Sequence, residues 1–177
     1  MVSLFVHHPS HVPYRAPTLF PRSRASILGH PIHVMLVPVP ITCFVGTLIS
    51  DIIYWQSANM QWANFSAWLL AVGVVVTILA VIAGAIDFLM SRRIRNMRTA
   101  WIHVGGNVVV FLLALINLFI HSRDGWTSVV PGGLILSFLT VLLLLVTGWE
   151  GWALVHKHGV GVEPEPEIQE PLRDDLP

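Results

Sequence analysis

The sequence predicts an all-α, polytopic integral membrane protein: a four-helix bundle with its N- and C-termini on the same side of the membrane. Hydrophobic residues make up 54% of the 177 positions and charged residues only 11%, a balance that soluble domains of this length do not have. Four apolar runs cover about residues 32–55, 66–90, 100–120 and 132–156. Each is long enough to cross about 30 Å of hydrocarbon at about 1.5 Å per residue.

Two polar segments flank the predicted four-span domain of residues 28–162. Residues 1–27 contain histidines and arginines, and we expect a flexible arm on which His7, His8 and His11 are solvated. This segment has no apolar core of the signal-peptide type, so nothing in it indicates cleavage or export. Residues 163–177 are acidic and rich in proline, which predicts a disordered tail because such residues have little to bury. The net charge of zero gives no support to a nucleic-acid partner, whereas the lipid bilayer is an expected one.

The first span begins with two histidines, His30 and His33. Pro38 and Pro40 lack N–H donors and leave two carbonyls without helical partners. Irregular backbone persists at membrane depth only where protein or a polar cavity covers it, so we expect the prolines to hold this segment open beside the histidines. Asp51 lies eighteen residues after His33 and therefore on the same face of a regular helix.

In the second span, Asp87 continues a face of small residues formed by Gly73, Thr77, Ala80 and Gly84. Small residues allow transmembrane helices to approach each other closely. We therefore expect Asp87 to point into the bundle.

A polar stripe follows the third span, where His103, Asn107, Asn117 and His121 share one face at 100° per residue. The two histidines are eighteen residues apart and so about 27 Å apart along a helix. Exposure of such a stripe to lipid would be costly, so it should face the bundle interior.

In the fourth span, the face that carries Thr140, Thr147 and Gly151 leads to His158, whereas His156 points nearly the opposite way. We therefore favour His158 over His156 as an interior residue. Glu150 lies near the same end of the span and receives no assignment.

Positive charge lies before the first span and between the second and third spans, and the other loops are almost uncharged. The residues concerned are Arg15, Arg22, Arg24, Arg92, Arg93, Arg95 and Arg98. The positive-inside rule then places both termini in the cytoplasm, for a multi-pass protein of a bacterial inner membrane.

With this orientation, polar groups from four helices gather at two levels. The inner centre, near the cytoplasmic face, is expected to contain His33, Asp87, His103, Asn107 and His158, with His30 as a further candidate. The outer centre would pair Asp51 with His121, either as a structural ion pair or as a second site.

Several segments resemble a known family when they are taken together. They are GHPIHVMLVPVPI, GAIDF, HVGGN, NLFIHSRD and GWEGWALVHKHGVGV, in this order over residues 28–162. They are similar to bacterial predicted membrane proteins called domain of unknown function twenty-two thirty-one. The usual family pattern, HPxHPxLVxFPI, has Pro and Phe where this chain has Val34 and Val39, and neither departure touches a histidine. The resemblance implies a four-helix membrane domain. Because some relatives are joined to cytochrome-type domains, it also implies a redox role beside a cytochrome or other redox membrane partner.

Two cofactor hypotheses follow from the inner centre. In the first, haem b is bound between His33 and His103, with His158 as a substitute ligand, for electron transfer at the membrane. Asn107 or Asp87 would orient a ligand's second nitrogen or meet a haem propionate. In the second, His33, His103, Asp87 and His158 bind a Zn, Fe or Cu ion directly.

Two further readings remain open from the sequence. The polar stripes would suit a proton relay or transport, although the middle of the third span is apolar. Alternatively, the polar groups only stabilise a structural or assembly protein. No metalloprotease signature such as HExxH occurs. The sequence leaves open whether the protein is an enzyme and whether it assembles into an oligomer.

Overall fold

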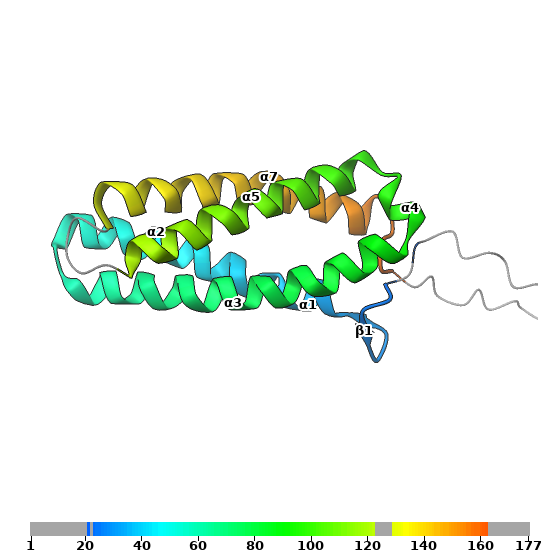
Figure 1. Cartoon of the computed structure of the whole chain (residues 1–177), viewed down its shortest axis with the longest axis horizontal. Coiled ribbons are helices and arrows are strands. Elements are labelled where there is room, and N and C mark those ends of the chain that lie inside the picture. The colour runs from blue at the N-terminus through cyan, green and yellow to red at the C-terminus, as the bar shows by residue number, and fades with distance from the viewer. Residues whose placement is uncertain (1–20, 22, 123–128, 163–177) are drawn as a thin grey trace, which may run out of the picture.

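The computed structural model of the chain describes residues 21, 23–122 and 129–162, and these form four long helices packed together (Figure 1). Helices α1 (Ile32–Leu36) and α2 (Pro38–Ser57) make the first span, and α3 (Met60–Met90) makes the second. Helix α5 (Arg98–His121) makes the third, and η1 (Val129–Gly133) with α7 (Leu134–His156) makes the fourth. All four are long and apolar enough to cross a membrane. The predicted all-α membrane bundle is confirmed.

The first span is interrupted at a single residue, which is less than its prolines predict. Val37 separates α1 from α2, but its φ of −54° and ψ of −37° are helical. Pro38 and Pro40 fall in the first turn of α2, where backbone N–H groups have no intrahelical partner in any case. The helix is thus interrupted at one residue only, and its path continues from α1 into α2.

Short connections place consecutive helices side by side. Ala58 adopts a left-handed conformation with φ of 54°, and the Asn59 side chain accepts the Gln61 backbone N–H to cap α3. Ser91 caps the four-residue helix α4 (Arg92–Arg95) in the same way. Helix α2 packs on α3 and α7, and α5 packs on α7 and α3. Helices α2 and α5 therefore occupy opposite corners of the bundle.

The middle of the bundle is an apolar layer. Its buried residues are Phe44, Leu70, Val74, Val110 and Ala114. Gly73 allows Phe44 to pack closely, since a Cβ there would lie 2.6 Å from the phenyl ring. Outward-facing residues are largely apolar too, as lipid contact requires.

The two described ends of the chain meet at one end of the bundle (Figure 1). The Gly161 N–H donates to the Pro21 carbonyl at 2.9 Å. Residues 23–25, expected to belong to the arm, bond to Asp87 at the end of the second span. Strands β1 (Ser26–Ile27) and β2 (His30–Pro31) form an antiparallel hairpin there. The predictions for residues 1–20 and 22, including His7, His8 and His11, and for the tail of 163–177 lie outside the described residues.

The first two spans and the last two form two similar hairpins. Four buried residues of α2 each have a buried counterpart seventy residues later in the sequence, in α5. In α2 these residues are Pro40, Phe44, Thr47 and Asp51, and in α5 they are Val110, Ala114, Asn117 and His121. The bundle therefore has an internal pseudo-two-fold arrangement, which places matching residues of the two hairpins opposite each other.

Candidate functional site: two polar centres on the pseudo-two-fold axis

The polar groups gather at two levels. We call His33, His103 and Asn107, near the described ends of the chain, the proximal centre. We call Asp51, Asn117, His121 and Ser137, at the opposite end, the distal centre. The proximal centre contains three residues of the predicted inner centre, and the distal centre contains both residues of the predicted outer pair.

His33 is fixed against the second span. Its Nδ1 lies 2.8 Å from the Ala80 carbonyl oxygen. Its ring also fits against Gly84, where a Cβ would lie only 2.9 Å from Nδ1. The half-buried imidazole is thus held in one orientation by a carbonyl and by the glycine one turn later.

His103 repeats this arrangement in the other hairpin. Its Nδ1 lies 2.9 Å from the Thr147 carbonyl oxygen, and a Cβ at Gly151 would lie 2.8 Å from its Cε1. In both hairpins, therefore, a histidine on the first helix contacts a carbonyl on the second and the glycine four residues after it. The predicted small-residue face of the second span is where His33 is bound.

The two rings approach each other across the bundle. Their centroids are 6.1 Å apart and their planes make an angle of 87°. A carbonyl only accepts hydrogen bonds, so Nδ1 must donate in both rings and a neutral imidazole keeps its lone pair on Nε2. Among the described residues, no hydrogen bond engages Nε2 of His33. Nε2 of His103 has only a 3.5 Å contact from the Asn107 amide nitrogen, whose shorter bond, 2.8 Å, is to the His103 carbonyl.

Asp87, expected to be a metal ligand, contacts the N-terminal loop. One carboxylate oxygen accepts the Ser23 hydroxyl at 2.7 Å, and the other accepts the backbone N–H groups of Arg24 and Ala25. The Ala25 carbonyl in turn accepts the Ile32 N–H. Asp87 thus fastens the loop to the end of the second span.

His158 and His30 are not brought into the proximal pair. His158 follows the end of α7, where its backbone N–H bonds to the Ala153 carbonyl, and His30 is exposed in strand β2. In the part of the chain that the structure describes, no three His, Cys, Asp or Glu side chains gather closely enough to hold a metal ion. The four-residue metal set is therefore not assembled in this arrangement: the Asp87 carboxylate bonds to the N-terminal loop, and His158 lies beyond the end of α7.

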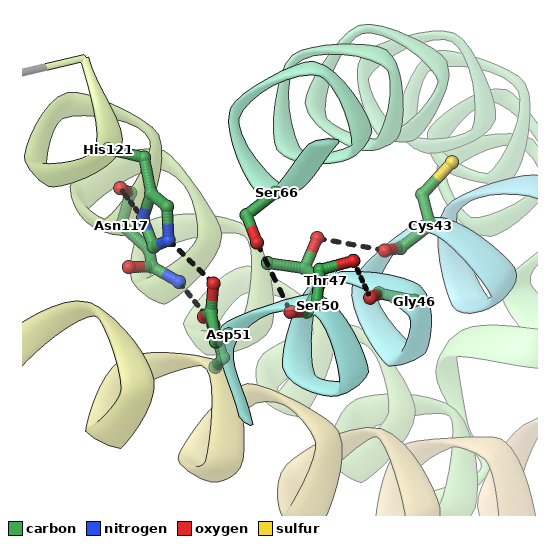
Figure 2. Close-up of polar contacts among 9 residues, drawn as sticks. Cys43, Gly46, Thr47, Ser50, Asp51, Ser66, Asn117 and His121 are labelled. Carbon is green, nitrogen blue, oxygen red and sulfur yellow. Dashed lines mark hydrogen bonds and ion pairs between the residues drawn. The ribbon is translucent and has the colours of Figure 1, made fainter. Parts of the chain in front are cut away.

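The distal centre is a closed network at the other end (Figure 2). Nε2 of His121 lies 2.9 Å from one Asp51 oxygen, and both side chains are fully buried. The Ser137 hydroxyl donates to the other Asp51 oxygen at 2.6 Å. The Asn117 amide donates to Ser137 at 2.8 Å, and Nδ1 of His121 lies 3.0 Å from the Asn117 backbone carbonyl. The predicted Asp51–His121 pair is present.

Sequence reasoning missed Ser137 as a partner of this pair. The signal available was its position one helical turn before Thr140, on the face already considered interior. A lone serine on such a face is common in helix contacts, so the residue type alone does not predict that its hydroxyl bonds to a carboxylate.

Between the two centres the buried hydroxyls are already used. Thr47, Thr77 and Thr140 each donate to the carbonyl four residues earlier in their own helix. Together with the apolar layer around Phe44 and Val110, these contacts separate the two centres by a largely apolar stretch.

Comparison with known proteins gives one match. The model of a family described as predicted membrane protein (DUF2231) matches residues 29–164. No curated protein and no solved structure matches the chain.

Proposed function

Because the chain belongs to the DUF2231 family of predicted membrane proteins, whose name assigns no activity, we propose a function from the geometry: a carrier of haem b at the proximal centre, for membrane electron transfer. The observation that supports it is the histidine pair. Both Nδ1 atoms are engaged by backbone carbonyls, which is the usual way to orient an imidazole whose Nε2 coordinates a metal.

The spacing of the rings suits this donor set. The ring centroids of His33 and His103 are 6.1 Å apart, so both imidazoles would be within reach of one bound group. Haem supplies one-electron chemistry when it is held by histidines. In this proposal His33 and His103 are the ligands, and Asn107 stabilises the helix turn that carries His103 through its bond to the His103 carbonyl.

The other predicted functions have less support. Direct coordination of Zn, Fe or Cu needs more than two ligands. The Asp87 carboxylate instead accepts hydrogen bonds from the N-terminal loop, and among the described residues no third metal-ligating side chain joins the histidine pair. A proton relay between the centres would have to cross the apolar layer. An electron carrier needs no such polar path.

The test is an absorption spectrum of the detergent-purified protein, expressed with a supply of haem, in oxidised and dithionite-reduced forms. We expect reduced cytochrome b bands that disappear in His33→Ala and His103→Ala. The matched control is His156→Ala, since that exposed ring stacks on Trp152, away from the pair. A featureless spectrum from folded protein refutes the haem proposal. Stoichiometric metal without haem in elemental analysis would favour the metal hypothesis instead.

We propose that both termini face the cytoplasm, in a bacterial inner membrane. The arginines of the described 2–3 connection, Arg92, Arg93 and Arg95, lie at the same end as Gly161, which supports the positive-inside orientation. A reporter that is active only in the cytoplasm should be active when it is fused to the C-terminus, and activity of a periplasmic reporter there would reverse the assignment.

In the proposed orientation, the proximal centre lies on the side where a cytoplasmic or membrane redox partner can approach. Purification in mild detergent would show whether a cytochrome or a second copy accompanies the chain.

A further inference from the structure

We propose that the distal centre is a proton-binding site: Asp51 and His121 together hold one proton more than a carboxylate and a neutral imidazole would. The site is distinct from the proximal centre, and the proposal does not depend on haem. It follows from the directions of the hydrogen bonds around one fully buried pair.

Ser137 fixes the first part of the network. Its hydroxyl has one proton, and the 2.6 Å contact commits this proton to Asp51. The Asn117 contact at 2.8 Å must therefore be donated by the amide N–H to the Ser137 oxygen. This assigns the orientation of the Asn117 amide and leaves the second Asp51 oxygen for His121.

His121 fixes the number of protons. Its Nδ1 faces the Asn117 backbone carbonyl at 3.0 Å, and a carbonyl can only accept, so Nδ1 carries a proton. Its Nε2 faces an Asp51 oxygen at 2.9 Å. A hydrogen bond there requires either an imidazolium that donates to a carboxylate or a protonated Asp51 that donates to Nε2. Both states contain one extra proton, and both are neutral overall.

Neutrality is what the surroundings favour. Asp51 is 0% exposed and His121 is 7% exposed, and an isolated charge is costly to bury. An ionised Asp51 beside a neutral His121 would leave a net negative charge in the bundle. It would also place a bare Nδ1 lone pair against a carbonyl oxygen.

A second observation is that the distal centre contains an acceptor without a donor. The side-chain oxygen of Asn117 is buried and has no hydrogen-bond partner among the described residues. The amide cannot be turned to satisfy it, because the N–H is committed to Ser137. Buried acceptors are normally satisfied, often by water. We therefore assign this oxygen to a water molecule, which is also the carrier that would bring a proton to the pair.

The experiment uses the full chain in detergent with ¹⁵N-labelled histidine. The His121 signal is identified by its loss in His121→Gln, and the carboxyl state of Asp51 by an infrared difference against Asp51→Asn. At neutral pH, we expect either two protonated ring nitrogens or one bare nitrogen together with a protonated Asp51. One bare ring nitrogen together with an ionised Asp51 overturns the proposal.

Two further readouts distinguish proton binding from a merely structural contact. Asp51→Asn removes the group that shares the proton, so His121 should be a neutral ring in this variant whichever of the two states the wild type adopts. The control Asp87→Asn, at the other end of the bundle, should leave the wild-type His121 signal unchanged. An imidazolium that persists in Asp51→Asn would refute the shared proton. Magnetisation transfer from water to the Asn117 amide protons should also be seen in the folded wild-type protein, and its absence would refute the assigned water.

Discussion

The proximal and distal centres occupy matching positions of the two hairpins but contain different pairs. His33 and His103 are matched across the pseudo-two-fold axis, and so are Asp51 and His121. The distal pair consists of an acid and a base, and each bonds to the other. The proximal pair consists of two identical bases, which cannot satisfy each other while both Nδ1 atoms donate to carbonyls.

This difference indicates what each end of the bundle is for. An acid and a base satisfy each other's hydrogen bonds and so join the two hairpins, which contributes to stability even if the pair also binds a proton. An identical pair with fixed rings retains two Nε2 atoms that suit a metal. Two polar levels that look alike in the sequence therefore have opposite bonding requirements.

The largest expected effect is at the distal pair. Asp51→Ala leaves His121 and Ser137 buried without their shared partner, and loss of one member of a buried ion pair costs about 3–5 kcal/mol. His33→Ala removes one neutral hydrogen bond and the packing of a half-buried ring against Gly84, and it should lower the free energy of unfolding by less than Asp51→Ala does. Reversible unfolding in mixed micelles measures both. Equal costs for the two variants would contradict the difference between the centres.

A charge exchange sharpens the same comparison. Because Asp51 and His121 are matched by the pseudo-two-fold arrangement, Asp51→His combined with His121→Asp should recover part of the stability that either single change loses. Recovery should be incomplete, since Ser137 would then face a histidine. A double variant no more stable than the sum of the single losses would show that the pair is not interchangeable.

The glycines beside the proximal rings come next in size. Gly84→Ala and Gly151→Ala place a Cβ within 3 Å of His33 and His103, respectively, and overpacking of this kind typically costs about 1–3 kcal/mol. Each should also displace its ring and lower haem binding, measured by reconstitution of the spectrum.

Two other glycines provide matched controls. A Cβ at Gly105 or Gly148 meets nothing within 4 Å, so alanine there should be neutral or should stabilise its helix by up to about 1 kcal/mol. Loss of haem binding in Gly105→Ala or Gly148→Ala would indicate a general effect on the helices instead of contact with the rings.

A smaller effect is expected at Asp87. Asp87→Ala removes the acceptor for Ser23 and for two backbone N–H groups, and we expect a local loss of about 1.5 kcal/mol. Limited proteolysis of the N-terminal loop should speed up while the proximal spectrum is retained. Asp87→Asn keeps one acceptor oxygen and should be milder. If Asp87→Asn instead abolished the cofactor bands, Asp87 would be part of the proximal centre after all.

The sequence predicted the four spans, because these depend on length and hydropathy. It also predicted that Asp51 meets His121, since both lie eighteen residues after a histidine on an interior face. It could not predict what Asp87 bonds to, because Ser23 and Ala25 lie in a loop without periodicity. His158 follows the end of α7, where the register of the helix no longer fixes its direction.

The smallest effect is expected at Ser137, and it tests how the distal centre closes. Ser137→Ala leaves the His121 bond to Asp51 intact but removes the second donor to the carboxylate and the acceptor for the Asn117 amide. Polar contacts between membrane helices typically contribute about 0.6 kcal/mol and up to about 1.7, so we expect a loss of about 1 kcal/mol. The matched control is Thr140→Val, which is also buried in α7 but loses only a bond to its own helix. If both variants unfold alike, the Asp51–His121 bond alone closes the distal end; a loss confined to Ser137→Ala shows that the fourth span takes part through its hydroxyl.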